Sequence, residues 1–404
     1  MAKQKLEVYI CSNVGIDYFF FLGRTIEQSG YSVKSIYLVS ETDYRRLAKT
    51  GGLGKIGLRI KMYLLYPVLL TYKVIFSKRD SVFVVTSNNF FAAYLVHLIL
   101  KIRSGRVIHL LYDLYPDAIE IAGAIKPNST LSKLIGKIMH RNLTKCDASV
   151  YLGKFLKEHA EMRWGRAPLS DIIDISTDLE LYSSEFKENN EQEKIILHYG
   201  GQLGHLHDAV SLIKSIEYVC QSDIAQFVEF NFYVSGAQAE FLRESLADFP
   251  VKIISAVPSS QWRQDIRNFH IGMVSLSTGG ASVCLPSKTY GMMAGGMAIL
   301  AICPKWSDLS TLISDIDSGW VINNSLYEFS DDLAGQDYLH NLQENKLPEV
   351  IAKEFYEQLK YLLANRNELN DKRRNAFFGV RKEHNISTLS AKWAKIISNP
   401  YSLQ

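Results

Sequence analysis

The sequence predicts an α/β protein with two Rossmann-like, doubly wound domains facing a central cleft and a helical segment at the C-terminus. In both halves of the chain, short apolar runs alternate with longer segments of helical period, the pattern of a parallel sheet covered on both faces. A charged stretch at residues 183–193 interrupts this alternation, which then starts again. Ligands of such folds bind outside the carboxyl ends of the strands, so we expect the cleft to lie there.

The first half of the chain is expected to form one domain over residues 1–183. Its buried strands are predicted at residues 6–11, 33–39, 81–86, 107–111 and 148–152. Helices are predicted at residues 19–29, 90–102 and 131–143. Residues 184–193 are interpreted as an interdomain linker because they are charged and have no apolar periodicity.

The second half is expected to form a second domain over residues 194–348. Its strands are predicted at residues 195–199, 230–234, 251–254, 271–276 and 298–302. Helices are expected to begin near residues 209, 237, 260 and 289. From about residue 349 the chain reads as helical to its end, and we expect residues 349–404 to pack back across the domains.

Composition narrows the class of protein. A chain with 47% hydrophobic and 22% charged residues is neither disordered nor collagen-like, and a net charge of +3 gives no case for a nucleic-acid partner. The five cysteines are widely spaced without a CxxC pair, which fits a reducing compartment. The N-terminal residues lack a signal-peptide pattern, and the apolar stretch at residues 63–76 is too short to cross a bilayer. We therefore expect a cytoplasmic protein.

A glycine-rich turn, HYGGQLGHLHD at residues 198–208, directly follows the first predicted strand of the second half. Gly200, Gly201 and Gly204 would let backbone N–H groups approach a phosphate, and the following helix would add the positive end of its dipole. The spacing is not that of the GxGxxG dinucleotide fingerprint. The alternative is a tight turn without a ligand.

A second motif, CLPSKTYGMMAGG, occupies residues 284–296. Pro286 and Ser287 are typical of a helix start, with Ser287 as the expected N-cap. Lys288 would then lie at the helix N-terminus, where a positive charge is unfavourable unless an anion such as a diphosphate is bound. A solvated lysine on a capped helix is the alternative.

Together, these two motifs resemble those of the retaining family 4 glycosyltransferases of the GT-B fold. The resemblance is strongest to the PSK-motif subgroup of bacterial surface-polysaccharide biosynthesis. It rests on YGGQLG…HD, on PSKTYG followed by AGG and a strand, and on the order of elements over most of the chain. It implies a nucleotide-diphosphate sugar donor, UDP- or GDP-linked, with no metal and no further cofactor. It also implies that the second domain binds the donor and the first domain the acceptor.

The resemblance also assigns site residues. Lys288 and His207 are the candidates that stabilise the departing diphosphate. The other residues assigned to the nucleotide sugar are Gly15, Gly201, Gln202, Gly204, Val257, Gly279, Gly280, Ser287 and Thr289. Many members have an arginine and a lysine where this chain has Gln202 and His207. Gly291 stands where many members have a ribose-binding glutamate. No covalent nucleophile is assigned, because transfer needs charge stabilisation and placement of the acceptor hydroxyl.

An acidic segment in the first half, IHLLYDLYPDAIEIAG at residues 108–123, follows a predicted strand. Asp113 and Asp117 are four residues apart and would share a face of a helix. By resemblance, Asp113 is the catalytic candidate on the acceptor side. The alternative is that either aspartate caps a helix that begins near Pro116.

Two further patterns are judged not to carry chemistry. Asp315 and Asp317 form a DxD, which holds a metal-bound nucleotide in another glycosyltransferase fold, but here they are expected at a solvated helix end. The ten histidines show no HxxxH or HExxH pair, so the sequence gives no support for a catalytic metal.

A basic segment spans residues 44–79, with nine lysines and arginines and no acidic residue. Apolar and aromatic residues are interleaved with them, and Pro67 is expected to kink the helix. Such a helix is attracted to an anionic bilayer surface, whereas the alternative is a domain helix with a basic outer face. Without these nine charges, the net +3 becomes −6 for the other 368 residues. The near-neutral total therefore hides one strongly basic region.

The sequence as a whole predicts a glycosyltransferase. It would move a sugar, with retention, from a nucleotide-diphosphate sugar to a lipid-linked or growing surface glycan. It would lie at the inner face of the plasma membrane. Two alternatives stay open: a sugar-nucleotide epimerase of the same fold, and a non-catalytic sugar-nucleotide-binding scaffold protein.

Overall fold

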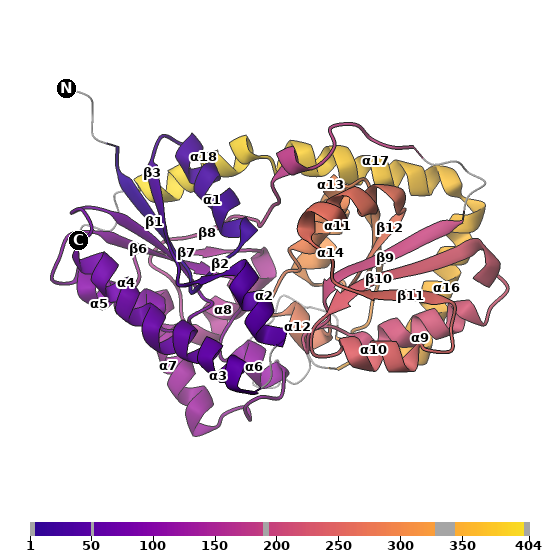
Figure 1. Cartoon of the computed structure of the whole chain (residues 1–404), viewed down its shortest axis with the longest axis horizontal. Helices are drawn as coiled ribbons and strands as arrows, with labels where there is room; N and C mark the ends of the chain where they lie inside the picture. Colours follow the sequence, from indigo (N-terminus) through magenta and orange to yellow (C-terminus); the bar gives the residue numbers. More distant parts are fainter. Residues whose placement is uncertain (1–4, 50–51, 189–193, 328–343, 400–404) are drawn as a thin grey trace. The chain divides into compact units, whose positions relative to one another are not determined.

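The computed structural model describes residues 5–49, 52–188, 194–327 and 344–399. The chain divides into two compact units (Figure 1). The first unit comprises Met1–Asp174 and Ile386–Gln404, and the second comprises Ile175–Asn385. The chain therefore leaves the first unit and returns to it for its last helix.

The first unit is built on a parallel six-stranded sheet with the order β3-β1-β5-β6-β7-β8. The strands are β1 (Glu7–Cys11), β3 (Ser32–Ile36), β5 (Val82–Thr86), β6 (Arg106–Leu111), β7 (Ala148–Tyr151) and β8 (Ser170–Ile172). Every residue of β1 and β5 is buried, as expected for central strands covered on both faces. A small parallel pair, β2 (Val14–Gly15) and β4 (Val39–Ser40), lies apart from this sheet.

Helices follow the strands of this unit in alternation. They are α1 (Asp17–Gln28), α2 (Glu41–Lys49), α3 (Gly52–Ile60), α4 (Tyr66–Ile75), α5 (Ala92–Leu100), α6 (Asp117–Ile121), α7 (Thr130–Lys145), α8 (Lys154–Trp164) and α18 (Ile386–Ser398). The start of α7 is capped by Ser129, whose Oγ accepts a hydrogen bond from the Ser132 amide at 3.3 Å. The last helix, α18, packs on α1, and Ser29 Oγ donates to the Ser390 carbonyl at 2.8 Å.

The basic segment is helical from residue 52 to residue 75 without a break. Its middle, η1 (Lys61–Leu65), is a π-helix between α3 and α4. Pro67, in the first turn of α4, has no N–H to donate to the carbonyl of Tyr63. Wider π-helical turns directly precede Pro67, and the expected kink stays a prediction.

The second unit has its own parallel six-stranded sheet, with the order β11-β10-β9-β12-β13-β14. The strands are β9 (Ile195–Gln202), β10 (Val228–Ser235), β11 (Val251–Ser255), β12 (Ile271–Ser275), β13 (Ala298–Ile302) and β14 (Gly319–Ile322). The order reverses between β9 and β12, which is the topological switch point of this sheet. Doubly wound sheets bind ligands outside the carboxyl ends of the strands at this point.

Helices of the second unit position these carboxyl ends. They are α9 (Ala209–Cys220), α10 (Ala239–Ser245), α11 (Ser259–Asp265), α12 (Thr278–Ala281), α13 (Lys288–Ala294), α14 (Asp308–Ile316), α16 (Pro348–Ala364) and α17 (Arg366–Glu383). In α17, the buried Arg373 donates to the Gly296 carbonyl at 3.0 Å and to the Lys187 carbonyl at 3.1 Å. Burial lowers the pKa of Arg373 to about 10.

The structure confirms the predicted fold class and the predicted alternation, with strand and helix ends shifted by a few residues. The predicted strand 33–39 is shorter, because β3 ends at Ile36 and Val39 pairs in β4 instead. The expected linker at 184–193 includes residues 189–193, which lie outside the described residues. Of the C-terminal helices, α16 and α17 belong to the second unit and α18 to the first.

Candidate functional site

The glycine-rich turn lies at the carboxyl end of β9, at the switch point of the second unit. Gly201 has a φ of +112°, a backbone conformation that favours glycine. A Cβ at this position would also overlap the Lys288 ammonium. The missing side chain of Gly201 is therefore what lets Lys288 lie directly against the turn.

Lys288 is the first residue of α13, and its side chain is exposed. Ser287 precedes it in the N-cap position, as predicted, but its side chain accepts no hydrogen bond from a backbone amide, so the expected side-chain cap is absent. Its backbone is already helical, with φ −59° and ψ −26°, rather than the extended conformation that capping residues adopt. Thr289 is fully buried, and its Oγ1 has no hydrogen-bond partner within the described residues.

His207, at the far end of the turn, is uncharged at neutral pH. Its Nδ1 lies 2.7 Å from the Ser275 carbonyl oxygen, which can only accept, so Nδ1 carries the proton. Burial lowers the pKa of His207, and the charge of Lys288 adds to this effect, while the hydrogen bond to Ser275 opposes it. The imidazole Nε2 is thus left as a hydrogen-bond acceptor, and the positive charge at this turn comes from Lys288.

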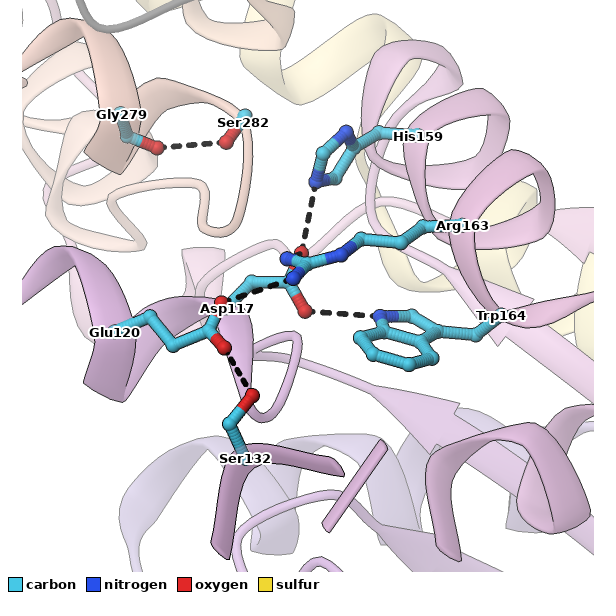
Figure 2. A network of polar contacts seen from close by, with 8 residues as sticks. All are labelled: Asp117, Glu120, Ser132, His159, Arg163, Trp164, Gly279 and Ser282. Carbon is cyan, nitrogen blue, oxygen red and sulfur yellow. Dashed lines mark hydrogen bonds and ion pairs between the residues drawn. The ribbon is translucent and has the colours of Figure 1, made fainter. Parts of the chain in front are cut away.

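A second turn, between β12 and α12, is bound to the glycine-rich turn by backbone contacts. The Ser277 amide donates to the Leu206 carbonyl at 2.9 Å, and Ser277 Oγ caps α12 by accepting from the Gly280 amide at 3.0 Å. The Gly279 carbonyl accepts from Ser282 Oγ at 2.7 Å (Figure 2). The structure thereby brings together the second-unit predictions Gly201, Gln202, Gly204, His207, Gly279, Gly280 and Lys288.

Trp262 of α11 is part of this site, and the sequence motifs did not identify it. Its Nε1 donates to His198 Nε2 at 2.9 Å, while His198 Nδ1 contacts the Asn231 carbonyl at 3.1 Å. Burial lowers the pKa of His198 to about 3, so this imidazole is neutral. Val257, which the resemblance assigns to the nucleotide sugar, lies half-buried in the loop between β11 and α11.

Gly291 explains how the indole is accommodated. A Cβ at Gly291 would lie 2.7 Å from Tyr182 Oη and 2.9 Å from the Trp262 ring. These two aromatic side chains thus fill the space that the Cβ of a glutamate at position 291 would need. A glycine inside a short helix is the one signal in the sequence that pointed to a close approach here.

In the first unit, Asp113 lies in the turn after β6. Ser87 Oγ accepts hydrogen bonds from the amides of Tyr112 at 2.9 Å and Asp113 at 3.1 Å, which fixes the start of this turn. The Asp113 side chain is half-buried, and burial raises its pKa to about 6. A carboxyl group with this pKa can exchange a proton near neutral pH.

Asp117 has a different role, because it is the centre of a buried ion-pair network (Figure 2). Its carboxylate contacts His159 Nε2 at 3.1 Å, the Arg163 guanidinium, and Trp164 Nε1 at 2.9 Å. Burial alone would raise the pKa of Asp117, but His159 and Arg163 outweigh it and hold the pKa below its ordinary value. The same guanidinium pairs with Glu120 at 3.0 Å. Asp117 therefore ties α6 to α8.

The predicted common helical face of Asp113 and Asp117 is absent, because α6 begins only at Asp117. Gly15, expected to allow a phosphate close to the backbone, pairs with Ser40 in the β2–β4 ribbon. A Cβ at Gly15 would lie 2.8 Å from the Tyr37 ring, so that ring covers this glycine.

The DxD pair lies at a helix end, as expected. The helix α14 ends at Ile316, and Asp317 adopts a left-handed conformation with φ +54°. Its exposed carboxylate pairs with Lys372 and accepts from Asn375 Nδ2 at 3.0 Å. Within the described ranges, no group of three or more His, Cys, Asp or Glu side chains could hold a metal ion. In that same part of the chain, no helix is both long and apolar enough to cross a membrane.

Comparison with known proteins identifies the fold. The chain is similar to sucrose-phosphate synthase from Thermosynechococcus elongatus, with a TM-score of 0.63, 11% identity and coverage of 99% of this chain and 100% of that one. It is also similar to HepE of Anabaena in complex with UDP and glucose, with a TM-score of 0.62, 10% identity and coverage of 97% and 99%. The chain has the GT-B fold. This confirms the fold that the resemblance implied.

Sequence comparison gives a more distant relationship. The chain matches no protein-family model. It is 22% identical over 223 residues to the probable glycosyltransferase WbjE of Pseudomonas aeruginosa. That match spans 52% of this chain and 54% of WbjE, about half of each protein.

Proposed function

We propose that this GT-B protein is a glycosyltransferase that moves a sugar, with retention, from a UDP- or GDP-linked donor. The observation that carries this proposal is the Lys288 ammonium against Gly201 at the switch point of the second unit. A cation beside backbone N–H groups and the start of a helix suits the diphosphate of such a donor. The similar HepE structure contains UDP and glucose, which supports a nucleotide-sugar donor here.

In this proposal, the second unit stabilises the leaving diphosphate. Lys288 neutralises part of the negative charge that develops as the bond to the anomeric carbon breaks. The backbone of the turn at Gly201 and Gly204 supplies further N–H donors. His207 is neutral and therefore does not neutralise the diphosphate, the role that the resemblance assigned to it. Instead, its Nε2 accepts a hydrogen bond from a hydroxyl of the donor sugar.

The acceptor side of the reaction is assigned to Asp113 in the first unit. Its carboxylate accepts the hydrogen bond of the incoming hydroxyl and orients the oxygen toward the anomeric carbon. Its pKa of about 6 leaves the group ionised at neutral pH and basic enough to share that proton. Asp117 takes no part, because its carboxylate is engaged by His159, Arg163 and Trp164.

The acceptor is proposed to be a lipid-linked or growing surface glycan, as in the PSK-motif subgroup. The basic segment at residues 44–79 would then bring the protein to the anionic inner face of the plasma membrane. Lys55, Arg59, Lys61 and Lys73 are exposed on it, and none forms an ion pair with another described residue. Unpaired basic side chains near such a surface gain from its negative potential.

Binding of the donor tests the proposal directly. Calorimetry with UDP-, GDP- and ADP-sugars is performed on the intact protein, on Lys288→Ala, and on Lys252→Ala, an exposed lysine of edge strand β11. Loss of a charge-assisted contact lowers affinity by about 10- to 100-fold in Lys288→Ala, whereas Lys252→Ala binds as the natural protein does. Failure of the intact protein to bind any nucleotide sugar would contradict the proposed function. Equal binding by both variants would remove Lys288 from the site.

A further inference from the structure

The helical segment over residues 52–75, together with Phe76 at its C-cap, exposes a row of large apolar side chains to solvent. The members of this apolar row are four residues apart and between 44% and 71% exposed: Ile56, Ile60, Leu64, Val68, Tyr72 and Phe76. A second row, on the opposite face, packs against the core of the first unit: Leu58, Met62, Tyr66, Leu70 and Val74. Figure 1 labels α3 and α4, which contain most of both rows. A contiguous exposed apolar surface of this kind marks an interaction site.

The π-helix keeps the apolar row on one side of the segment. In a regular α-helix of 3.6 residues per turn, residues four apart are offset by about 40°, so a long row would wind round the helix. The wider turns of η1 (Lys61–Leu65) offset residues in the opposite sense. The apolar row therefore stays exposed over its whole length, while Tyr66, Leu70 and Val74 stay in the core.

The charges beside the apolar row identify the partner's chemistry. Lys55, Arg59, Lys61 and Lys73 lie directly next to members of the row, and the whole of residues 44–79 contains no acidic residue. A second copy of this chain would bring like charges together. An anionic, apolar partner satisfies both features, and a bilayer with anionic headgroups is such a partner.

The segment is also connected to the proposed acceptor site. Asn89 Nδ2 donates to the Met62 carbonyl in η1 at 3.1 Å. Two residues earlier in the same loop, Ser87 Oγ holds the amides of Tyr112 and Asp113. One loop thus contacts both the helical segment and the turn that carries Asp113, within a single unit.

We propose that the apolar row inserts into the interface of an anionic bilayer, with the helical segment lying in the membrane plane beside the acceptor carboxylate. The inference rests on the proposed function for its purpose, because a lipid-linked acceptor is reached from the bilayer surface. It goes further in assigning the attachment to apolar insertion rather than to charge attraction alone. Insertion resists salt, whereas attraction between charges is screened by it.

Flotation on lipid vesicles tests insertion. The intact protein is mixed with vesicles of phosphatidylcholine, with and without phosphatidylglycerol, at low and at high salt. The test variant is Leu64→Ser/Val68→Ser. The matched control is Leu134→Ser/Val210→Ser, which changes two other exposed apolar residues, on α7 and α9. All four side chains are exposed, so both variants are expected to fold, which circular dichroism verifies.

The natural protein and the control are expected to float with phosphatidylglycerol vesicles, and part of this binding persists at high salt. Loss of two inserted side chains lowers the partition coefficient of Leu64→Ser/Val68→Ser by about tenfold or more. Binding that disappears in salt, and is equal in both variants, would overturn insertion and leave charge attraction. A natural protein that does not float, and that sediments as a dimer which Leu64→Ser/Val68→Ser dissociates, would overturn insertion. The apolar row would then be a contact between two copies of the chain. If the protein binds no vesicle but calorimetry shows that it binds a nucleotide sugar, the membrane proposals fail while the proposed donor site is retained.

Discussion

Replacing Asp113 by asparagine is expected to raise the stability of the protein while abolishing sugar transfer. Burial raises the pKa of Asp113 from its ordinary value of 3.8 to about 6. The folded state therefore binds this proton more tightly than the unfolded state, and ionisation destabilises the fold. At about 1.36 kcal/mol per pKa unit the full effect is about 3 kcal/mol, and partial exposure reduces it to about 1 to 3 kcal/mol.

The sign of the effect defines its pH dependence. Below the unfolded pKa of 3.8 the carboxyl is neutral in both states, so the Asp113 stability contribution is fully present. As the pH rises toward about 6 the unfolded state ionises first, and stability is lost progressively until the folded group has ionised as well. Asparagine is neutral throughout, so the stability gain of Asp113→Asn over the natural protein develops as the pH rises through this range and is complete above about pH 6.

Urea unfolding followed by tryptophan fluorescence measures this difference at about pH 3.5 and about pH 7.5. Asp248→Asn, which changes an exposed aspartate in the loop after α10, is the control and shows no comparable dependence. A variant Asp113→Asn that is less stable at neutral pH, or whose stability difference does not change with pH, would refute the reasoning. Transfer measured on the same samples separates the roles, because a residue that only shapes the turn would leave catalysis intact.

Two further substitutions test the remaining geometry. Gly201→Ala adds a Cβ at a residue with positive φ, and this Cβ would overlap the Lys288 ammonium. We expect the free energy of unfolding, measured in urea, to fall by about 1 to 3 kcal/mol, and nucleotide-sugar binding to weaken. Gly57→Ala, in α3 of the first unit with no atom within 4 Å of the added Cβ, is the control that lowers neither. Asp117→Ala removes the buried carboxylate that His159, Arg163 and Trp164 contact, and is expected to cost about 3 to 5 kcal/mol. The exposed pair broken by Asp317→Ala costs about 1 kcal/mol or less. Equal losses in the last two would contradict the assignment of Asp117.

The alternation of strands and helices could be predicted because each central strand is buried on both faces and reads as a continuous apolar run. Val82–Thr86 and Ala298–Ile302 are examples, and every residue in them is buried. Features set by single hydrogen bonds could not be predicted in this way. The β2–β4 ribbon has only two residues per strand, and the π-helix η1 has only five residues.

The parts of the candidate site that depend on local backbone conformation could be predicted from the sequence. The parts that depend on tertiary contacts were harder to predict. Gly201 and Lys288 follow from a turn and a helix start, which are local signals. Asp117 was ambiguous from sequence, since its partners His159 and Arg163 lie more than forty positions away on α8. Ser287 has the residue type of an N-cap, but its own backbone is helical and leaves its hydroxyl without that role.

Trp262 shows what a glycine in a binding turn can signify. The glycines of the second unit suggested room for a phosphate, yet at Gly291 the space belongs to Trp262 and Tyr182. Near Gly200, a Cβ would lie 2.7 Å from Trp262 Nε1. The missing side chains thus accommodate an indole that is itself fixed by His198, whereas at Gly201 the approaching group is a charged ammonium. A turn rich in glycine therefore identifies a place of close packing, and the chemistry of the site follows from the side chain that enters it.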